Sequence, residues 1–134
     1  MLKFMSPKFV ENSKVPVYLS YFVPFNISAI TLFCVVFSRG KISDKTRRHE
    51  TIHFQQYVET LVVGFLVIYV LEYLYGLIKY RCMHLAYRMI SFEQEAYLYD
   101  DVKNYLQIRK RYEWLKFRPW FTYIYIRIYY IYII

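Results

Sequence analysis

The longest apolar stretch of this chain, from Leu61 to Ile78, constrains the fold more than any other feature of the sequence. Only Gly64, Glu72 and Gly76 interrupt it. A stretch that is apolar on all faces must be covered, either by the core of a domain or by the hydrocarbon of a membrane, which a helix of about 20 residues crosses. We expect membrane association, with Glu72 paired or facing a cavity, because an isolated charge is costly in lipid.

The length and charge of the chain limit what surrounds this stretch. The 134 residues favour a single domain over residues 1–134, and 57% hydrophobic with 21% charged residues is typical of a folded protein. The formal net charge is +8, and basic residues are densest at 45–48 and 109–111. Neither cluster belongs to a nucleic-acid-binding motif, so we expect no nucleic-acid partner and interpret these charges as solvated or membrane-flanking.

The N-terminal part predicts short strands and no targeting signal. Residues 1–14 lack the apolar core of a cleaved signal peptide. Residues 15–37 are rich in β-branched and aromatic side chains, and Pro16 and Pro24 disfavour a membrane helix there. We therefore expect a hairpin of strands near 17–23 and 30–37. Cys34 and Cys82 form no CxxC pair, which is typical of free thiols in a reducing compartment.

Helices are expected over most of the remaining chain. Ser43 or Asp44 can cap a helix at 45–60, the apolar helix follows at 61–80, and Ser91 can cap a helical region at 91–117. Residues 119–134 form a Tyr- and Ile-rich tail. We interpret it as an edge strand, as an interfacial segment or as a product of drift in the coding sequence. The sequence thus predicts an α+β fold, mostly helical, with a short N-terminal β-hairpin and one strongly apolar helix that is long enough for a membrane.

The run His49-Glu50-Thr51-Ile52-His53 has the HExxH spacing. Residues four apart lie on one face of a helix, so His49 and His53 can bind one metal ion. Zinc takes histidine nitrogen at about 2.0–2.1 Å and keeps one of four positions for water in a catalytic site. Glu50 is placed to accept a proton from metal-activated water rather than to bind the metal. The motif therefore predicts a zinc site with Glu50 as the general base.

A catalytic zinc site needs a third protein ligand, and three downstream residues are candidates. Glu93 and Glu95 lie two residues apart on the predicted helix, so they face nearly opposite ways and only one of them can easily reach the metal. Both would also suit a solvated capping turn. His84 is a weaker alternative, because a lone histidine is more often a polar packing residue than a ligand.

The downstream run Glu93-Gln94-Glu95-Ala96-Tyr97 resembles the gluzincin pattern, in which HExxH precedes a helix carrying E-x-x-A-(D/N). This pattern is found in HtpX-like and CAAX-prenyl membrane endopeptidases and in small ImmA/IrrE-type peptidases. The resemblance covers about residues 45–114 and implies a zinc peptidase with Glu93 as the third ligand. The sequence differs at Tyr97, where those families have an Asp or Asn that supports the site.

Two further expectations accompany this resemblance. The chain is also similar to small uncharacterised bacterial and phage proteins with an H-E-x-x-H-x-x-Q run and a later F-E-x-E-A-Y. In zincins the strand before the motif helix often lines the cleft, so the resemblance implies that 30–37 pairs with an extended peptide. Gln56 lies on the same helix face as His49, which suits either a hydrogen bond to a ligand or plain surface polarity.

A geometric limit applies to the return of Glu93 toward the motif. A straight helix from Lys45 to Tyr80 would carry the chain about 40 Å beyond His53. The connection from Tyr80 to Glu93 reaches at most about 45 Å when fully extended. Glu93 can therefore be a ligand only if the helix breaks, and because glycine is a poor residue for a helix interior we predict a break near Thr60–Gly64.

These observations together predict a zinc-dependent metalloendopeptidase that hydrolyses peptide bonds, associated with a membrane and carrying a site that suits the cytoplasmic side. The alternative is a non-catalytic small membrane protein, including a viral one, whose HExxH is fortuitous or decayed. A structural or regulatory metal-binding domain would bind zinc without hydrolysis. A nucleic-acid binder would show an affinity that depends steeply on salt.

Overall fold

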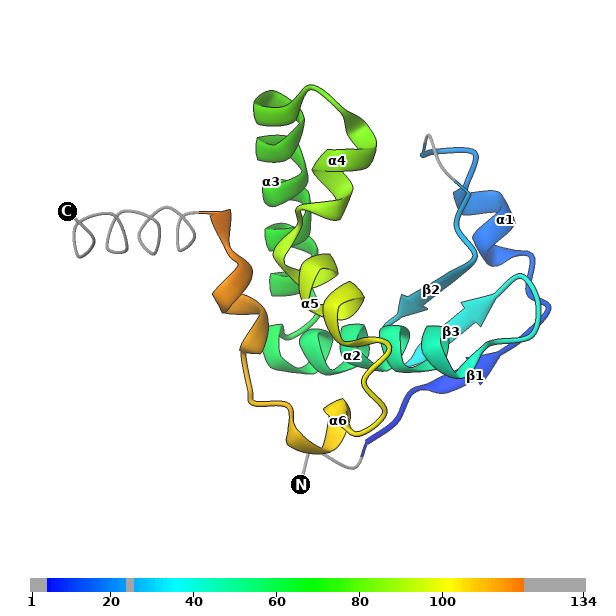
Figure 1. The fold of residues 1–134 in the computed structure, drawn as a ribbon. Helices are drawn as coiled ribbons and strands as arrows, with labels where there is room; N and C mark the ends of the chain where they lie inside the picture. The colour runs from blue at the N-terminus through cyan, green and yellow to red at the C-terminus, as the bar shows by residue number, and fades with distance from the viewer. Residues whose placement is uncertain (1–4, 24–25, 120–134) are drawn as a thin grey trace.

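The computed structural model describes residues 5–23 and 26–119, which form a mixed α+β fold (Figure 1). The elements in these ranges are β1 (Lys8–Val10), α1 (Val15–Leu19), β2 (Ala29–Leu32), β3 (Val35–Ser38), α2 (Asp44–Thr60), α3 (Val63–Tyr80), α4 (Met83–Arg88), α5 (Ser91–Tyr99), α6 (Tyr105–Ile108) and a 3-10 helix, Glu113–Phe117. The predicted α+β class with one strongly apolar helix is confirmed. Of the predicted tail at 119–134, residues 120–134 lie outside the described residues.

The strand predicted at 17–23 is wrong, because α1 occupies the start of this segment. Pro16 lies in the first turn of α1, where its fixed φ suits a helix and its missing N–H leaves no helical hydrogen bond unmade. The hydroxyl of Ser20 donates to the Pro16 carbonyl oxygen at 2.7 Å and helps to close the end of this short helix. The β-branched composition of the segment therefore misled the sequence interpretation.

The strand predicted at 30–37 is two strands, β2 and β3, which form an antiparallel hairpin. Phe33, in the turn between them, has a φ of 57°, a left-handed conformation that a bulky residue rarely adopts. No glycine, proline or asparagine marks this turn, which is why the sequence did not reveal it. The strand order is β1-β3-β2, with β1 parallel to β3, so β2 forms an edge of the sheet.

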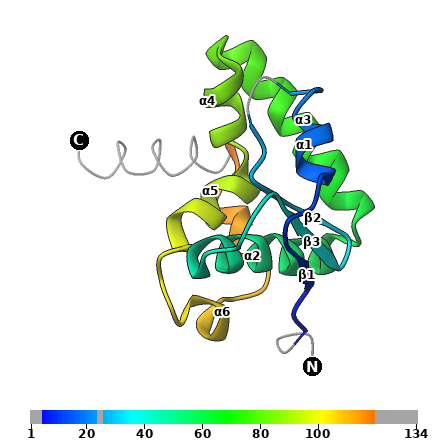
Figure 2. The ribbon, with the colours of Figure 1, turned by 90° about the vertical axis from the view of Figure 1, so that its right-hand side faces the viewer.

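Helix α2 begins and ends close to its predicted limits of 45 and 60. Ser43 is its N-cap, and the Ser43 hydroxyl oxygen accepts a hydrogen bond from the Thr46 N–H at 3.1 Å. The predicted break at 60–64 is present, because Leu61 and Val62 have φ values of 55° and 52° and α3 starts at Val63. This change of direction lets α5 return to pack on α2 (Figures 1 and 2).

The helix predicted over 91–117 is interrupted. Helix α5 ends at Tyr99, and the chain continues through α6 and the 3-10 helix. Ser91 is not the N-cap, a position that Ile90 takes without a side-chain cap. The Ser91 N–H instead donates to the Glu72 carboxylate at 2.7 Å, and Arg118 pairs with the same carboxylate. Glu72 thus stabilises the start of α5, which explains a buried charge in an otherwise apolar helix.

Two hydrophobic clusters hold the helices around α2. The larger one joins α2, α3 and α5 through stacked rings of Tyr57, Phe65 and Phe92, with Trp114 beside Phe92. The smaller one places Ile52 of α2 against Ala96 of α5 and Tyr105 of α6. These contacts fix the distance between α2 and α5, the two helices that carry the candidate metal ligands. The two hydrophobic clusters therefore hold α2 and α5, and with them the candidate ligands, in place.

Helix α3 is long and apolar enough to cross a membrane by length and composition, with a mean hydropathy of 1.5 over 18 residues. Only 17% of this window is buried inside the protein. Its inner face packs against α4, where Gly76 approaches Ala86 so closely that an added Cβ would lie 3.0 Å from the Ala86 Cα. The prediction of an apolar helix is thus confirmed, and membrane association stays a prediction.

Candidate metal centre

Helix α2 presents the two histidines of the HExxH run toward one point. His49 and His53 are one helical turn apart, and their Nε2 atoms lie 3.1 Å from each other. Both residues are buried, with 9% and 7% of their surface exposed. The regular helix and its Ser43 cap therefore bring two imidazole nitrogens close enough to share a ligand.

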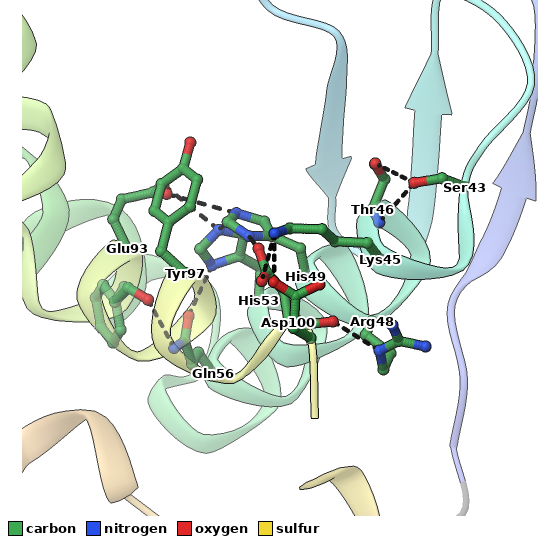
Figure 3. Close-up of polar contacts among 12 residues, drawn as sticks. Ser43, Lys45, Thr46, Arg48, His49, His53, Gln56, Glu93, Tyr97 and Asp100 are labelled. Carbon is green, nitrogen blue, oxygen red and sulfur yellow. Dashed lines mark hydrogen bonds and ion pairs between the residues drawn. The ribbon is translucent and has the colours of Figure 1, made fainter. Parts of the chain in front are cut away.

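Helix α5 brings the carboxylate of Glu93 to the same point (Figure 3). Its Oε2 lies 3.6 Å from the His49 Nε2, and its Oε1 lies 3.4 Å from the His53 Nε2. The hydroxyl of Tyr69, from α3, donates to Glu93 Oε1 at 2.9 Å. Three helices thus contribute to the position of this carboxylate, which lies 40 residues or more from both histidines in sequence.

The three side chains could together hold a metal ion. Their candidate ligand atoms all lie within 4.8 Å of one another. Two ligands of a tetrahedral metal ion at bonds near 2.1 Å are separated by about 3.4 Å. The two Nε2 atoms lie 3.1 Å apart, and the shortest distances from the histidines to Glu93, 3.4 and 3.6 Å to its two different oxygens, are close to this value. Glu93 Oε2 is buried and has no hydrogen-bond partner in the described part of the chain. A cation at this point would satisfy it.

Gln56 fixes the tautomer of His53. The Gln56 amide nitrogen donates to the Phe92 carbonyl oxygen at 3.1 Å and to Glu95 Oε2 at 2.9 Å. Its carbonyl oxygen must then face His53 Nδ1, 2.8 Å away, which therefore carries the hydrogen. When the ring is neutral, the lone pair of His53 Nε2 is left for a metal. Of the two alternatives for Gln56, the structure has the hydrogen bond to a candidate ligand.

Asp100 orients the imidazole of His49, as Gln56 orients that of His53. Its Oδ2 lies 3.3 Å from His49 Nδ1, and Lys45 pairs with the same carboxylate at 3.4 Å. The backbone is held too, because Arg48 Nε donates to the Asp100 carbonyl oxygen at 2.7 Å. This contact directs the His49 Nε2 toward Glu93. The ring of Tyr97, where the resembling families have Asp or Asn, contacts His49 edge-on with ring centroids 4.6 Å apart, and the carboxylate beside His49 Nδ1 is that of Asp100.

We expect the substitution Asp100→Ala to weaken zinc binding about 10- to 100-fold, because the hydrogen bond that orients His49 is lost. Competition with a chromogenic chelator measures the affinity. The control is Asp101→Ala, which removes a neighbouring exposed carboxylate that also pairs with Lys45 but does not contact His49. Equal affinities for the two variants would contradict a supporting role for Asp100.

Glu50 is held beside this site by the sheet. The Thr31 hydroxyl, from β2, donates to Glu50 Oε2 at 2.6 Å. Glu50 is buried, and its charge is one of the causes that raise the pKa of His53. It therefore lies close to the candidate ligands without belonging to the group of three. Helix α2 carries the predicted general base, and the hydrogen bond from β2 holds its carboxylate in place.

The histidines and Glu93 form a charge-coupled group in the metal-free protein. Burial lowers the pKa of His53, but attraction to the Glu93 carboxylate outweighs it and raises the pKa to about 9. Burial raises the pKa of Glu93, but electrostatic attraction to His53 and the close contacts with both imidazoles hold it well below its usual range. Without a metal, the pair is therefore ionised at neutral pH.

We expect the metal-free protein to lose stability as the pH rises from 6.5 to about 9, since His53 gains a proton more readily when folded than when unfolded. Glu93 acts in the opposite direction, so its contribution is lost only in acid. Because one pKa unit corresponds to about 1.4 kcal/mol, the loss from His53 is about 3 kcal/mol. Urea unfolding in a chelator at several pH values measures it, and His53→Gln should flatten this part of the profile.

The other two candidate ligands lie elsewhere. Glu95, on the same helix as Glu93, is fully buried and accepts hydrogen bonds from Tyr105, Arg109 and Gln56. His84 is exposed on α4 and is not part of the group that could hold a metal. The geometry therefore favours Glu93 over both alternatives, with neither Glu residue in a solvated capping turn.

No known family, curated protein or solved structure matches this chain. The resemblance to gluzincins therefore depends on the motif residues and their arrangement alone.

Sequence reasoning missed three residues that shape the site: Thr31, Tyr69 and Asp100. Asp100 had a usable signal, because it follows Glu93 by seven residues, two helical turns, on the same face. Thr31 and Tyr69 had none, since their contacts with Glu50 and Glu93 cross between elements that are far apart in sequence. Their roles depend on tertiary packing.

Proposed function

We propose that the protein is a zinc-dependent metalloendopeptidase of the gluzincin type. The observation that carries this proposal is the buried oxygen Glu93 Oε2, which has no hydrogen-bond partner among the described residues and faces His49 Nε2. A buried carboxylate oxygen without a partner is costly unless a cation is present. Two imidazole nitrogens and one carboxylate form the donor set of many catalytic zinc sites.

Each residue of the proposed site has a separate role. His49, His53 and Glu93 would hold the metal, while Gln56 and Asp100 keep the two imidazoles oriented toward it. Bound zinc supplies a Lewis acid that polarises a carbonyl group and makes water nucleophilic near neutral pH. Glu50 takes the proton from the attacking water and passes it to the leaving amine, held in place by Thr31.

Strand β2 supports a peptide as the substrate. It is an edge strand, and it packs beside α2 next to the proposed base. An extended peptide can add to such an edge through main-chain hydrogen bonds. The Thr31 carbonyl oxygen already accepts a hydrogen bond from the Tyr57 hydroxyl at 3.2 Å. A peptide would therefore pair with positions beside Thr31 or displace the Tyr57 hydroxyl.

The metal content of the purified chain tests the site, and elemental analysis measures it. We expect near-stoichiometric zinc in the wild type and its loss in Glu93→Ala and in His53→Ala, because two protein ligands hold zinc poorly. His84→Ala is the matched control, since His84 is exposed and outside the group. A wild type that binds no zinc after reconstitution would refute the proposal, and zinc retained in Glu93→Ala would refute Glu93 as a ligand.

A further inference from the structure

The outer face of α3 is an apolar surface. Seven aliphatic residues on it are at least half exposed: Val63, Leu66, Val67, Val70, Leu71, Leu74 and Ile78. Their spacing of three and four residues places them on one side of the helix, over about 22 Å. The charged residues of α3 are Glu72, which is buried, and Lys79, at its C-terminal end. This face, here called the α3 stripe, is too continuous to be scattered surface apolar residues.

The opposite face of α3 packs against the protein through its buried residues Phe65, Glu72 and Gly76. Phe65 belongs to the core, Tyr69 donates to Glu93, and Glu72 bonds to Ser91 and Arg118. Helix α4 packs along the same side (Figure 1). A helix that is apolar outward and anchored inward is suited to lie flat on an apolar surface.

The distribution of charge favours an anionic surface. Three of the chain's ten acidic residues are exposed, namely Glu11, Asp44 and Asp101. All three lie around the N-terminal end of α2, where Asp101 pairs with Lys45 and Glu11 contacts Arg47. Helix α3 starts at the other end of α2, about 24 Å away along the helix axis. The exposed charged side chains on the side of the molecule with the α3 stripe are therefore basic.

The charged groups behind the α3 stripe argue against a transmembrane orientation. If α3 crossed a membrane, the ion pair of Glu72 with Arg118 would enter the hydrocarbon with it. So would α4, which packs against α3 and exposes His84 and Arg88. Ionisable groups are costly there, whereas a helix lying in the interfacial plane keeps them on the protein side. The basic residues Lys79 and Arg81, at the end of α3, can then reach lipid phosphates.

We propose that the α3 stripe docks the protein onto the surface of an anionic lipid membrane, with α3 lying in the membrane plane. The aliphatic side chains enter the boundary between headgroups and acyl chains, and the cationic surface adds attraction that salt weakens. This proposal uses no metal and does not depend on peptidase activity. A second copy of the chain is the competing occupant of the same face.

Sedimentation of the full chain with lipid vesicles tests the proposal. We expect binding to phosphatidylcholine vesicles that contain phosphatidylglycerol, and weaker binding to phosphatidylcholine alone or at high salt. The double substitution Val67→Glu with Leu71→Glu should reduce binding at least about tenfold, because two apolar side chains in the interface become charged. The matched control is Leu98→Glu with Ile108→Glu, the same charge change at exposed aliphatic residues outside α3.

Three outcomes would overturn the docking surface. The wild type does not bind the anionic vesicles; both double variants lose binding equally; or the wild type forms a stable dimer without lipid that only the α3 variant disrupts. Circular dichroism and unfolding midpoints of both variants confirm that each is folded. A folded α3 variant that no longer binds, beside a control that does, supports the proposal.

The two native cysteines test the orientation. Cys34 is exposed in the turn between β2 and β3, and Cys82 is exposed directly after α3. If α3 lies in the membrane plane, a membrane-impermeant maleimide added outside sealed vesicles labels both. If α3 crosses the membrane, the two cysteines lie on opposite sides and one is protected until detergent is added. Protection of one cysteine would overturn the in-plane orientation.

Discussion

Replacing Glu50 with glutamine should lower kcat/KM for peptide hydrolysis by about 10²- to 10⁴-fold, because the amide cannot act as a general base. The zinc content should stay unchanged, since Glu50 is not one of the three candidate ligands. The Thr31 hydroxyl, 2.6 Å from Glu50 Oε2, can also bond to an amide oxygen, so the side chain should keep its position. Cleavage of a mixture of dye-labelled peptides by the zinc-loaded protein measures the effect.

Asp44→Asn is the control for this experiment, because it removes an exposed carboxylate from the same helix. We expect it to retain wild-type hydrolysis. Zinc-loaded wild type that cleaves no peptide in the mixture would refute the peptidase proposal and leave a structural metal site. Hydrolysis that persists in Glu50→Gln would instead remove Glu50 from the role of base.

The substitution Arg109→Met should lower the free energy of unfolding by about 3–5 kcal/mol, the usual result of removing one partner from a buried ion pair. The Arg109 side chain is 2% exposed and bonds to the carboxylates of Glu59 and Glu95. Its loss would leave both carboxylates without this partner in the protein interior. Urea unfolding of the metal-free protein at neutral pH measures the change.

Arg111→Met is the matched control, because Arg111 is exposed and two residues away; we expect a change within about 0.5 kcal/mol. Adding Glu95→Gln to Arg109→Met should recover part of the loss, since one stranded charge disappears. The double variant also tests the hydrogen bonds of Gln56, because Gln56 donates to the substituted Glu95 and accepts from His53. If the double variant recovered no stability, an unpaired buried carboxylate would not be the cause of the loss in Arg109→Met.

Local sequence signals were sufficient for α2 and for the turn after it. Ser43 is a residue type that caps helices, and the HExxH spacing matches one helical turn. The reach of the chain required a break before α3 if Glu93 is a ligand, and the break is present. The same kind of signal failed at α1 and at the β2–β3 turn. Pro16 is compatible with a first helical turn as well as with a strand, and Phe33 adopts a left-handed conformation that its side chain does not favour.

The sequence by itself determined that His49 and His53 share a helix face and that Glu50 lies beside them, and it predicted a turn near residues 60–64 on the condition that Glu93 reaches the histidines. These follow from helix geometry and chain length, which act over a few residues. Only the tertiary structure decided between Glu93 and Glu95, because the buried Arg109 engages Glu95 and leaves Glu93 facing the histidines. It alone also assigned Asp100 and Thr31 to the site and decided between the two alternatives for Gln56, because hydrogen bonds between distant elements depend on how the helices and sheet pack.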